Sequence, residues 1–147
     1  MNVTQDTIKH IAAVRTLLCV CAGWLNGRGE RHDKSKLASP EKETFEEWRP
    51  KLSSMLVDSP EYANALAKMG TGLRHHYENN SHHPEHYKNG IAGMDLLDLV
   101  EMVCDWMVAA ENQGKPIDPG WAQKRFGIEP QLLAIIMNTV DALNLNR

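Results

Sequence analysis

Apolar residues recur at intervals of three and four positions along most of the chain, the spacing of one face of an α-helix. No stretch alternates apolar and polar residues over five positions, so β-strands are not expected. The pattern therefore predicts an all-α, single-domain protein of five or six helices. Helices are expected over about residues 5–25, from 40 onward, and over 60–77, 95–110, 121–126 and 130–143.

Residues that begin and end helices divide this pattern into segments. Ser39-Pro40-Glu41 and Ser59-Pro60-Glu61 each place a capping serine before a proline at the first helical position. Gly27 and Gly29 are expected to end the first helix. From Lys115 onward the chain shows no chemical signal, so its helices at 119–143 are expected to serve packing alone.

Composition narrows the class of protein. With 147 residues, 42% hydrophobic and 24% charged, the chain suits one soluble domain spanning 1–147. A net charge of −3 supplies no basic field, so nucleic acid is not an expected partner. The three cysteines form no CxxC pair, and neither a signal peptide nor an apolar run near bilayer length is evident. We therefore expect a cytoplasmic protein, of a bacterium or a phage-infected host, with no membrane partner.

Five of the seven histidines lie in the twelve residues from His75 to His86. Imidazole is the commonest metal ligand in proteins, and packing alone does not explain such a concentration. With His10, His32-Asp33 and Asp105, this run would supply imidazole and carboxylate ligands without any thiolate. That donor set suits iron, manganese, zinc, cobalt or nickel better than calcium or magnesium. One or two divalent transition-metal ions are therefore the expected cofactor.

Three acidic residues form a stripe on the otherwise apolar helix expected at 95–110. At about 100° per residue, Asp98 and Asp105 differ by about 20°, and Glu101 lies within about 60° of both. Buried carboxylates need cations, which a metal ion or a histidine cluster would supply. The stripe is equally typical of the one solvated face of an amphipathic helix. Both interpretations stay open, as does the choice between Asp98 and Asp105 as a ligand.

These motifs resemble the HD-domain superfamily of metal-dependent phosphohydrolases over about residues 10–110. His10 matches the first histidine of that family, His32-Asp33 its namesake doublet and Asp105 its closing aspartate. The pair His75-His76, followed by His83, is similar to the extra histidines of members that bind two metals. The resemblance implies a helical HD-like bundle, with a first metal held by His10, His32, Asp33 and Asp105. His76, favoured over His75, and His83 would complete a second site or contact the substrate.

A closer likeness links the chain to a small uncharacterised family of phage and bacterial proteins. It rests on His32-Asp33-Lys34-Ser35-Lys36, on the histidine run and on the segment from Asp98 to Trp106. That family implies no activity, so this likeness bears on the fold more than on the function.

The HD resemblance implies a hydrolase that uses metal-activated water on a nucleotide or a related small phosphate ester. Asp33, Glu101 and His76 are then the expected catalytic residues. A second group of cationic side chains and loop histidines is expected to bind the substrate phosphate: Arg28, Arg31, Lys36, His82 and His86. The loop histidines have two further interpretations, as metal ligands or as caps of helix ends.

Two alternatives remain beside the hydrolase. Some HD-like proteins with extra histidines hold two irons and oxidise their substrates with oxygen. In the other alternative, the protein binds a nucleotide or a partner and catalyses nothing. The oligomeric state does not follow from the sequence.

Overall fold

The computed structural model describes residues 2–56 and 59–144, and within these ranges it is all-α, as expected, with no β-strand. The ends of the expected domain at 1 and 147 lie outside the described residues. The α-helices are α1 (Val3–Arg31), α2 (Glu41–Leu52), α3 (Pro60–Asn79), α4 (Leu96–Asn112), α5 (Pro119–Phe126) and α6 (Pro130–Asn144). Three short 3-10 helices lie between them: η1 (Lys34–Leu37), η2 (Pro84–His86) and η3 (Gly90–Gly93).

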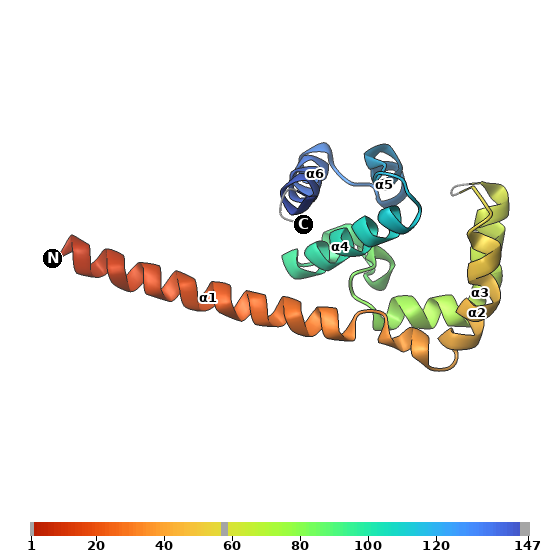
Figure 1. Ribbon diagram of the computed structural model, residues 1–147, viewed down its shortest axis with the longest axis horizontal. Helices are drawn as coiled ribbons and strands as arrows, with labels where there is room; N and C mark the ends of the chain where they lie inside the picture. The colour runs from red at the N-terminus through yellow and green to blue at the C-terminus, as the bar shows by residue number, and fades with distance from the viewer. Residues whose placement is uncertain (1, 57–58, 145–147) are drawn as a thin grey trace. The chain divides into compact units, whose positions relative to one another are not determined.

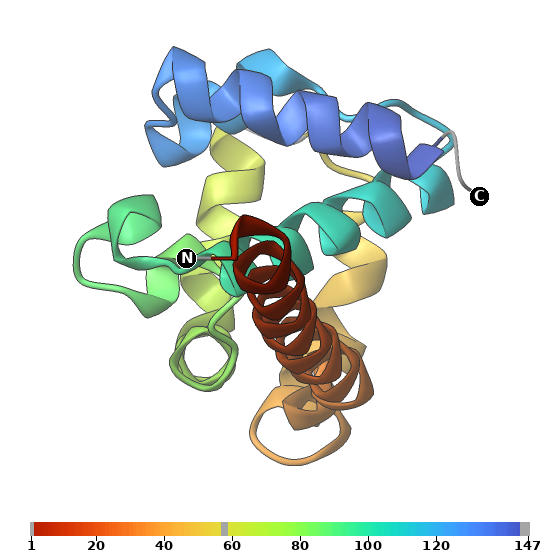
Figure 2. The ribbon, with the colours of Figure 1, turned by 90° about the vertical axis from the view of Figure 1, so that its left-hand side faces the viewer.

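Contacts divide the chain into two units, residues 1–32 and residues 33–147. The first unit is a single uninterrupted helix, α1, seen along its length in Figure 1 and closer to end-on in Figure 2. The sequence-based end of this helix near Gly27 is wrong. Gly27 and Gly29 are both helical, at a cost of about 1 kcal/mol each. The helix ends only at His32, whose amide donates to the Arg28 carbonyl oxygen over 2.7 Å.

Hydropathy sets α1 apart from the other helices. The segment Val3–Leu37 contains an 18-residue window of mean hydropathy 1.4, long and apolar enough to cross a membrane by length and composition alone. This corrects the expectation that no apolar stretch approaches bilayer length. Core helices of soluble proteins and signal sequences meet the same criteria, so this property is weak evidence for a membrane span.

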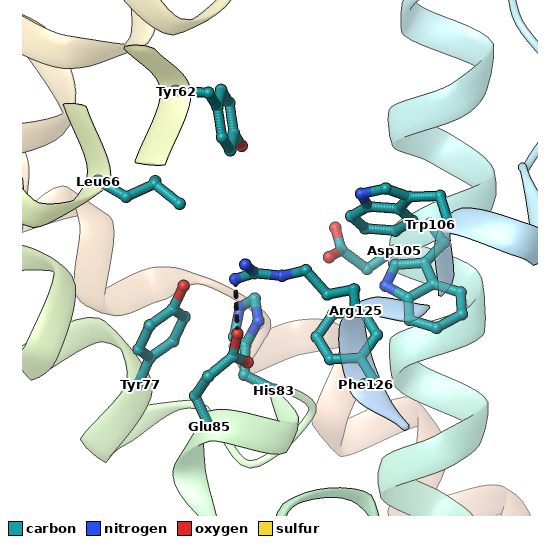
Figure 3. Close-up of a pocket in the computed structure, with 10 residues that line it drawn as sticks. Tyr62, Leu66, Tyr77, His83, Glu85, Asp105, Trp106, Arg125 and Phe126 are labelled. Atoms are coloured by element: carbon teal, nitrogen blue, oxygen red, sulfur yellow. Dashed lines mark hydrogen bonds and ion pairs between the residues drawn. The ribbon is translucent and has the colours of Figure 1, made fainter. Parts of the chain in front are cut away.

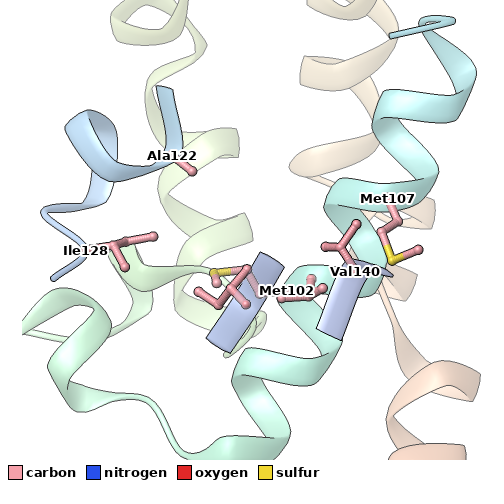
Figure 4. Close-up of a cluster of buried hydrophobic side chains, with 7 residues drawn as sticks. Met102, Met107, Ala122, Ile128 and Val140 are labelled. Carbon is pink, nitrogen blue, oxygen red and sulfur yellow. The ribbon is translucent and has the colours of Figure 1, made fainter. Parts of the chain in front are cut away.

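The apolar core of the second unit lies between α4, α5 and α6. Met102, Val103 and Met107 on α4 pack with Ile136 and Val140 on α6 (Figure 4). Ala122 and Ile128, from α5 and the turn after it, complete this cluster of buried side chains. Val103 and Met107 lie four positions apart on α4 and Met102 precedes Val103, so the three side chains cover less than half of the helix circumference and the other side is available to face other elements.

The other part of the second unit is a pair of adjacent helices, α2 and α3 (Figure 1). Their close approach depends on Gly72, where a Cβ atom would overlap the side chain of Thr44 on α2. Ser59 caps α3 as expected, its hydroxyl accepting from the Tyr62 amide over 3.1 Å. The first residue of α2, Glu41, is fully buried against the last turns of α3. A carboxylate thereby meets the start of the histidine run.

Candidate metal centre

Four ligand atoms converge in the second unit, from three segments of the chain. Asp33 precedes η1, His76 lies in the last turn of α3, and His82 and His83 lie in the loop that follows. One ligand atom of each residue lies within 4.8 Å of those of the other three. His76 and His82 are almost completely buried. Histidine and aspartate side chains here form a group that could hold a metal ion.

The distances between these atoms match those around one ion. His76 Nε2 lies 2.9 Å from His83 Nε2 and 3.5 Å from Asp33 Oδ1, and His82 Nε2 lies 3.7 Å from the same oxygen. Two ligands each about 2.1 Å from an ion, at tetrahedral or octahedral angles, lie about 3.0–3.4 Å apart. The four atoms therefore need only small shifts to coordinate one transition-metal ion.

Two carboxylates, the buried Glu41 and the partly buried Glu101, lie behind two of the imidazoles. His76 Nδ1 lies 2.9 Å from Glu41 Oε2, and His82 Nδ1 lies 3.2 Å from Glu101 Oε1. An Nδ1–H that donates to a carboxylate leaves the lone pair on Nε2, the atom that faces the cluster. Carboxylate–histidine pairs of this kind orient the ligands of metal sites and raise their basicity. The arrangement fits a metal ion at the Nε2 atoms.

The segment Asp33-Lys34-Ser35-Lys36 supplies the acidic ligand and two supports. Asp33 has φ 55° and ψ 12°, the left-handed region, which costs a residue with a Cβ atom about 1–2 kcal/mol. Lys36 Nζ lies 2.6 Å from Asp33 Oδ2, so Oδ1 is the oxygen that faces the histidines. The Ser35 hydroxyl donates to Glu41 Oε2 over 2.9 Å. This turn therefore directs the Asp33 carboxylate toward His76.

Burial keeps the rings of two ligands, His76 and His83, neutral. Burial lowers the pKa of His83 to about 3, and its neighbours His82 and His76 act in the same direction. Burial, followed by the charge of Lys36, also lowers the pKa of His76. Neutral imidazole is the form that binds metals, so these rings are ready to coordinate near neutral pH without losing a proton.

A pocket of about 190 Å³ adjoins the cluster, and His83 and Asp105 belong to its wall (Figure 3). A carboxylate oxygen of Asp105 lies within 4.8 Å of a ring nitrogen of His82. The negative charge of Asp105 opposes the fall in the pKa of His83. Asp105 therefore lies where the ligand cluster meets the space that a substrate could enter.

The expected ligands His10 and His32 cannot share one metal ion. They lie twenty-two positions apart along one continuous helix and its cap, about 33 Å along the helix axis. Each ligand must lie about 2 Å from the ion, so the first site expected from the HD resemblance, which needs both residues, is wrong. His32 directly precedes Asp33, and its role as a ligand stays a prediction.

Most other expected site residues have defined partners. Lys36, expected to bind substrate, pairs with Asp33 and lies 4.8 Å from the centre of the Phe45 ring. His82, also expected to bind substrate, belongs to the ligand cluster. His86 Nδ1 donates to the Tyr77 carbonyl oxygen over 2.8 Å and thus caps the end of α3, one of the interpretations left open. Arg28 and Arg31 lie in the last turn of α1, in the first unit, and their contact with substrate stays a prediction.

The three residues of the acidic stripe have different roles. Asp98 is buried and accepts from the Ser81 hydroxyl, the Tyr87 hydroxyl and the Asp95 amide, which makes it a structural residue of the α4 cap. Glu101 holds His82, and Asp105 faces the pocket. The stripe is therefore not a solvated face, and Asp105 rather than Asp98 lies beside the histidines.

Glu41 is the principal residue that the sequence did not reveal. Its carboxylate bridges two histidines of α3, with Oε1 lying 2.7 Å from His75 Nδ1 and Oε2 lying 2.9 Å from His76 Nδ1. A glutamate after Ser-Pro is typical of the first turn of any helix. Only the packing of α2 on α3 distinguishes it, so no signal in a single sequence could have found it. Of the pair His75-His76, His76 is the residue that belongs to the ligand cluster, and its role as a ligand stays a prediction.

Comparisons with known proteins identify the family and nothing about its chemistry. No curated protein and no solved structure matches the chain. One family model matches residues 1–142, and its description is "Family of unknown function (DUF5662)". The match includes every residue of the candidate metal centre. The chain belongs to this family.

Proposed function

We propose that the protein is a metal-dependent phosphohydrolase that acts on small phosphate esters, with one divalent transition-metal ion held by Asp33, His76, His82 and His83. The observation that carries this proposal is the convergence of three imidazole nitrogens and one carboxylate oxygen, with a further carboxylate beside each of two of the rings. A second carboxylate, Asp105, stands beside this group at a pocket. A metal, a carboxylate and an adjoining cavity are the parts that metal-assisted hydrolysis requires.

A distant relationship to the HD-domain phosphohydrolases forms part of the proposal. In its support, the aspartate of the His-Asp doublet and the later histidines gather at one point, in the chain order of that family. The departure is His10, which the continuous α1 separates from His32. The metal site proposed here therefore differs from the HD pattern in its first ligand.

Each residue near the site has a distinct task in this mechanism. An ion held by Asp33, His76, His82 and His83 would supply Lewis-acid chemistry, which lowers the pKa of a bound water toward about 7 and polarises the phosphoryl oxygen. Asp105 accepts a proton from the attacking water as the water oxygen bonds to phosphorus. The bond from phosphorus to the leaving oxygen breaks, and Asp105 returns the proton to that oxygen. Glu41 and Glu101 act through the histidines that they orient and touch no reacting atom.

Replacement of Asp105 tests this assignment. Asp105→Asn should retain the metal ion, because none of the four proposed ligands changes, and should release phosphate about 10²- to 10⁴-fold more slowly. Asp141→Asn on α6 is a matched control at an exposed carboxylate and should behave like the wild type. Equal rates of phosphate release for the two variants, both loaded with metal, would contradict the role of Asp105.

The oxygenase alternative predicts different products from the same sample. The wild-type protein, loaded in turn with iron, manganese, zinc, cobalt and nickel, is assayed with a panel of phosphate esters for phosphate release and oxygen uptake. Phosphate release without oxygen uptake supports the hydrolase. Oxygen uptake without phosphate release favours iron-dependent oxidation, and neither activity with any metal favours a binding protein.

A further inference from the structure

The pocket beside the metal centre has hydrogen-bond donors of its own, supplied by α5. Arg125 extends across it toward Glu85, and Arg125 Nη2 donates to Glu85 Oε1 over 2.9 Å (Figure 3). A guanidinium group carries five N–H donors, and this bond uses one of them. Both side chains of the pair remain about one-third exposed, so a ligand can reach them. Arg125 can therefore bind a further acceptor inside the pocket.

A second donor in the pocket wall lacks a partner. The indole Nε1–H of Trp121 is buried and has no hydrogen-bond partner among residues 2–56 and 59–144. A buried donor left unsatisfied costs about 1–3 kcal/mol, which a ligand oxygen would recover. Arg125 and Trp121 lie one helical turn apart on α5, so both belong to the same face of that helix. The pocket thus favours a ligand rich in acceptors.

The size of the pocket limits the ligand. Its volume of about 190 Å³ is below the range of about 300–1,000 Å³ typical of pockets that bury drug-sized ligands. The aromatic wall is packed against itself, because the Trp106 and Phe126 rings stack at 13° with centroids 5.5 Å apart. Trp121 contacts both rings edge-on. The pocket therefore encloses a compact group rather than a whole nucleotide.

We propose that this pocket binds the phosphoryl end of a compact phosphate ester, whose oxygens accept from Arg125 and from the Trp121 indole N–H. The inference rests on the proposed function and deepens it, because the pocket is lined by the proposed ligand His83 and by Asp105, which lies beside the ligand cluster. The terminal oxygens of a phosphate dianion are acceptors only, and the planar guanidinium group matches them with two parallel hydrogen bonds. The substrate is then a small phosphate monoester rather than a nucleotide.

Equilibrium binding of inorganic phosphate to the metal-loaded protein tests the pocket without requiring turnover. Arg125→Ala should weaken phosphate binding about 10- to 100-fold, the effect of losing a charged hydrogen bond. Trp121→Phe keeps an aromatic ring but removes the N–H, and it should weaken binding about 2- to 10-fold. Lys124→Ala removes the neighbouring cation on α5, which does not line the pocket, and should leave phosphate binding unchanged.

Controls for folding and a variant with the opposite expected effect accompany this experiment. Metal content and helical circular dichroism identify any variant that has not folded, and Glu85→Gln provides a reverse test, because removal of the competing carboxylate should tighten phosphate binding. Phosphate binding that is equal in Arg125→Ala and Lys124→Ala, both folded and metal-loaded, would overturn the proposal. Phosphate binding that depends on Arg125, in a protein that hydrolyses no ester, would support this pocket while contradicting the proposed hydrolase.

The substrate specificity of the wild-type protein tests whether the pocket prefers small esters. Methyl phosphate or phenyl phosphate should be hydrolysed with a higher kcat/KM than adenosine monophosphate, and Arg125→Ala should raise the KM of the favoured ester. A preference for adenosine monophosphate would overturn the assignment to a compact ester.

Discussion

The two sides of α4 differ in what holds them in place. One side presents Met102, Val103 and Met107 to an apolar core formed with α5 and α6. The other presents Glu101 and Asp105 to a histidine cluster formed with α3 and the residues around Asp33. The core is stabilised by removing apolar surface from water, which needs no ligand. The cluster gathers imidazoles and carboxylates, which an ion would hold together. The two regions should therefore respond to different perturbations.

Truncation of the core should produce the largest change in stability. Met102 is almost completely buried, and Met102→Ala should lower the free energy of unfolding by about 2–5 kcal/mol, because the smaller side chain leaves a cavity. Urea unfolding followed by circular dichroism measures the loss. The loss should be equal with and without chelator, and a chelator-dependent loss would show that the core and the cluster are not independent.

Metal removal should act on the cluster alone. At a free metal concentration of 100 times Kd, a bound ion adds about 2.7 kcal/mol to the free energy of unfolding. Chelator should remove this increment from the wild type and from Met102→Ala, but Asp33→Asn should show no increment to remove. Urea unfolding of the three proteins, each with metal and with chelator, measures the effect. An undiminished metal increment in Asp33→Asn would mean that the ion binds elsewhere.

Replacing the carboxylates that orient the histidines should have a smaller effect than removing the metal, and the effect should be confined to metal affinity. Glu41→Gln and Glu101→Gln should each weaken metal binding about 10- to 100-fold, as is typical for partners of metal-bound histidines. Glu47→Gln is a matched control on α2, since Glu47 pairs with Lys51 at the surface. Competition with a chromogenic chelator measures the three affinities. Equal metal affinities of Glu41→Gln and Glu47→Gln would show that Glu41 contributes only to packing.

The smallest effect is the acid response of the metal-free protein. Because burial lowers the pKa of His83 to about 3, far below the ordinary 6.5, its neutral ring favours the folded state above pH 6.5. The free energy of unfolding therefore falls progressively as the pH drops through 6.5, by about 1 kcal/mol between pH 6.5 and pH 5.5. His83→Gln does not titrate, so its unfolding free energy should decline less between these two pH values. An identical decline in both proteins would contradict the assignment.

Helical periodicity accounts for most of what the sequence predicted about the fold. The start of α3 agrees with the expected capping residue Ser59, because capping is a local interaction, whereas α2 begins after Pro40 without a side-chain cap. The end of α1 was wrong, because glycine lowers helix stability without ending a helix unless another structure competes. The all-α class follows from the pattern, whereas the single domain and the HD-like topology stay predictions.

The candidate site was predicted only as far as residue chemistry allows. Asp33, His76, His83 and Asp105 were identified because histidine runs and buried carboxylates are unusual in any fold. Glu41, Trp121 and Arg125 escaped notice, because their roles depend on which helices pack together. His10 was included through the family pattern and excluded by the length of one helix. A single sequence thus identifies residues that are chemically unusual but not those that matter through packing.

The most direct test of the metal centre is the metal content of the purified protein, measured by elemental analysis beside Asp33→Asn and Glu47→Gln. We predict one transition-metal ion per chain in the wild type and in Glu47→Gln, and none in Asp33→Asn, while all three remain equally helical by circular dichroism. Equal metal content in all three proteins, or no metal in the wild type after loading with any of the five metals, would contradict the account.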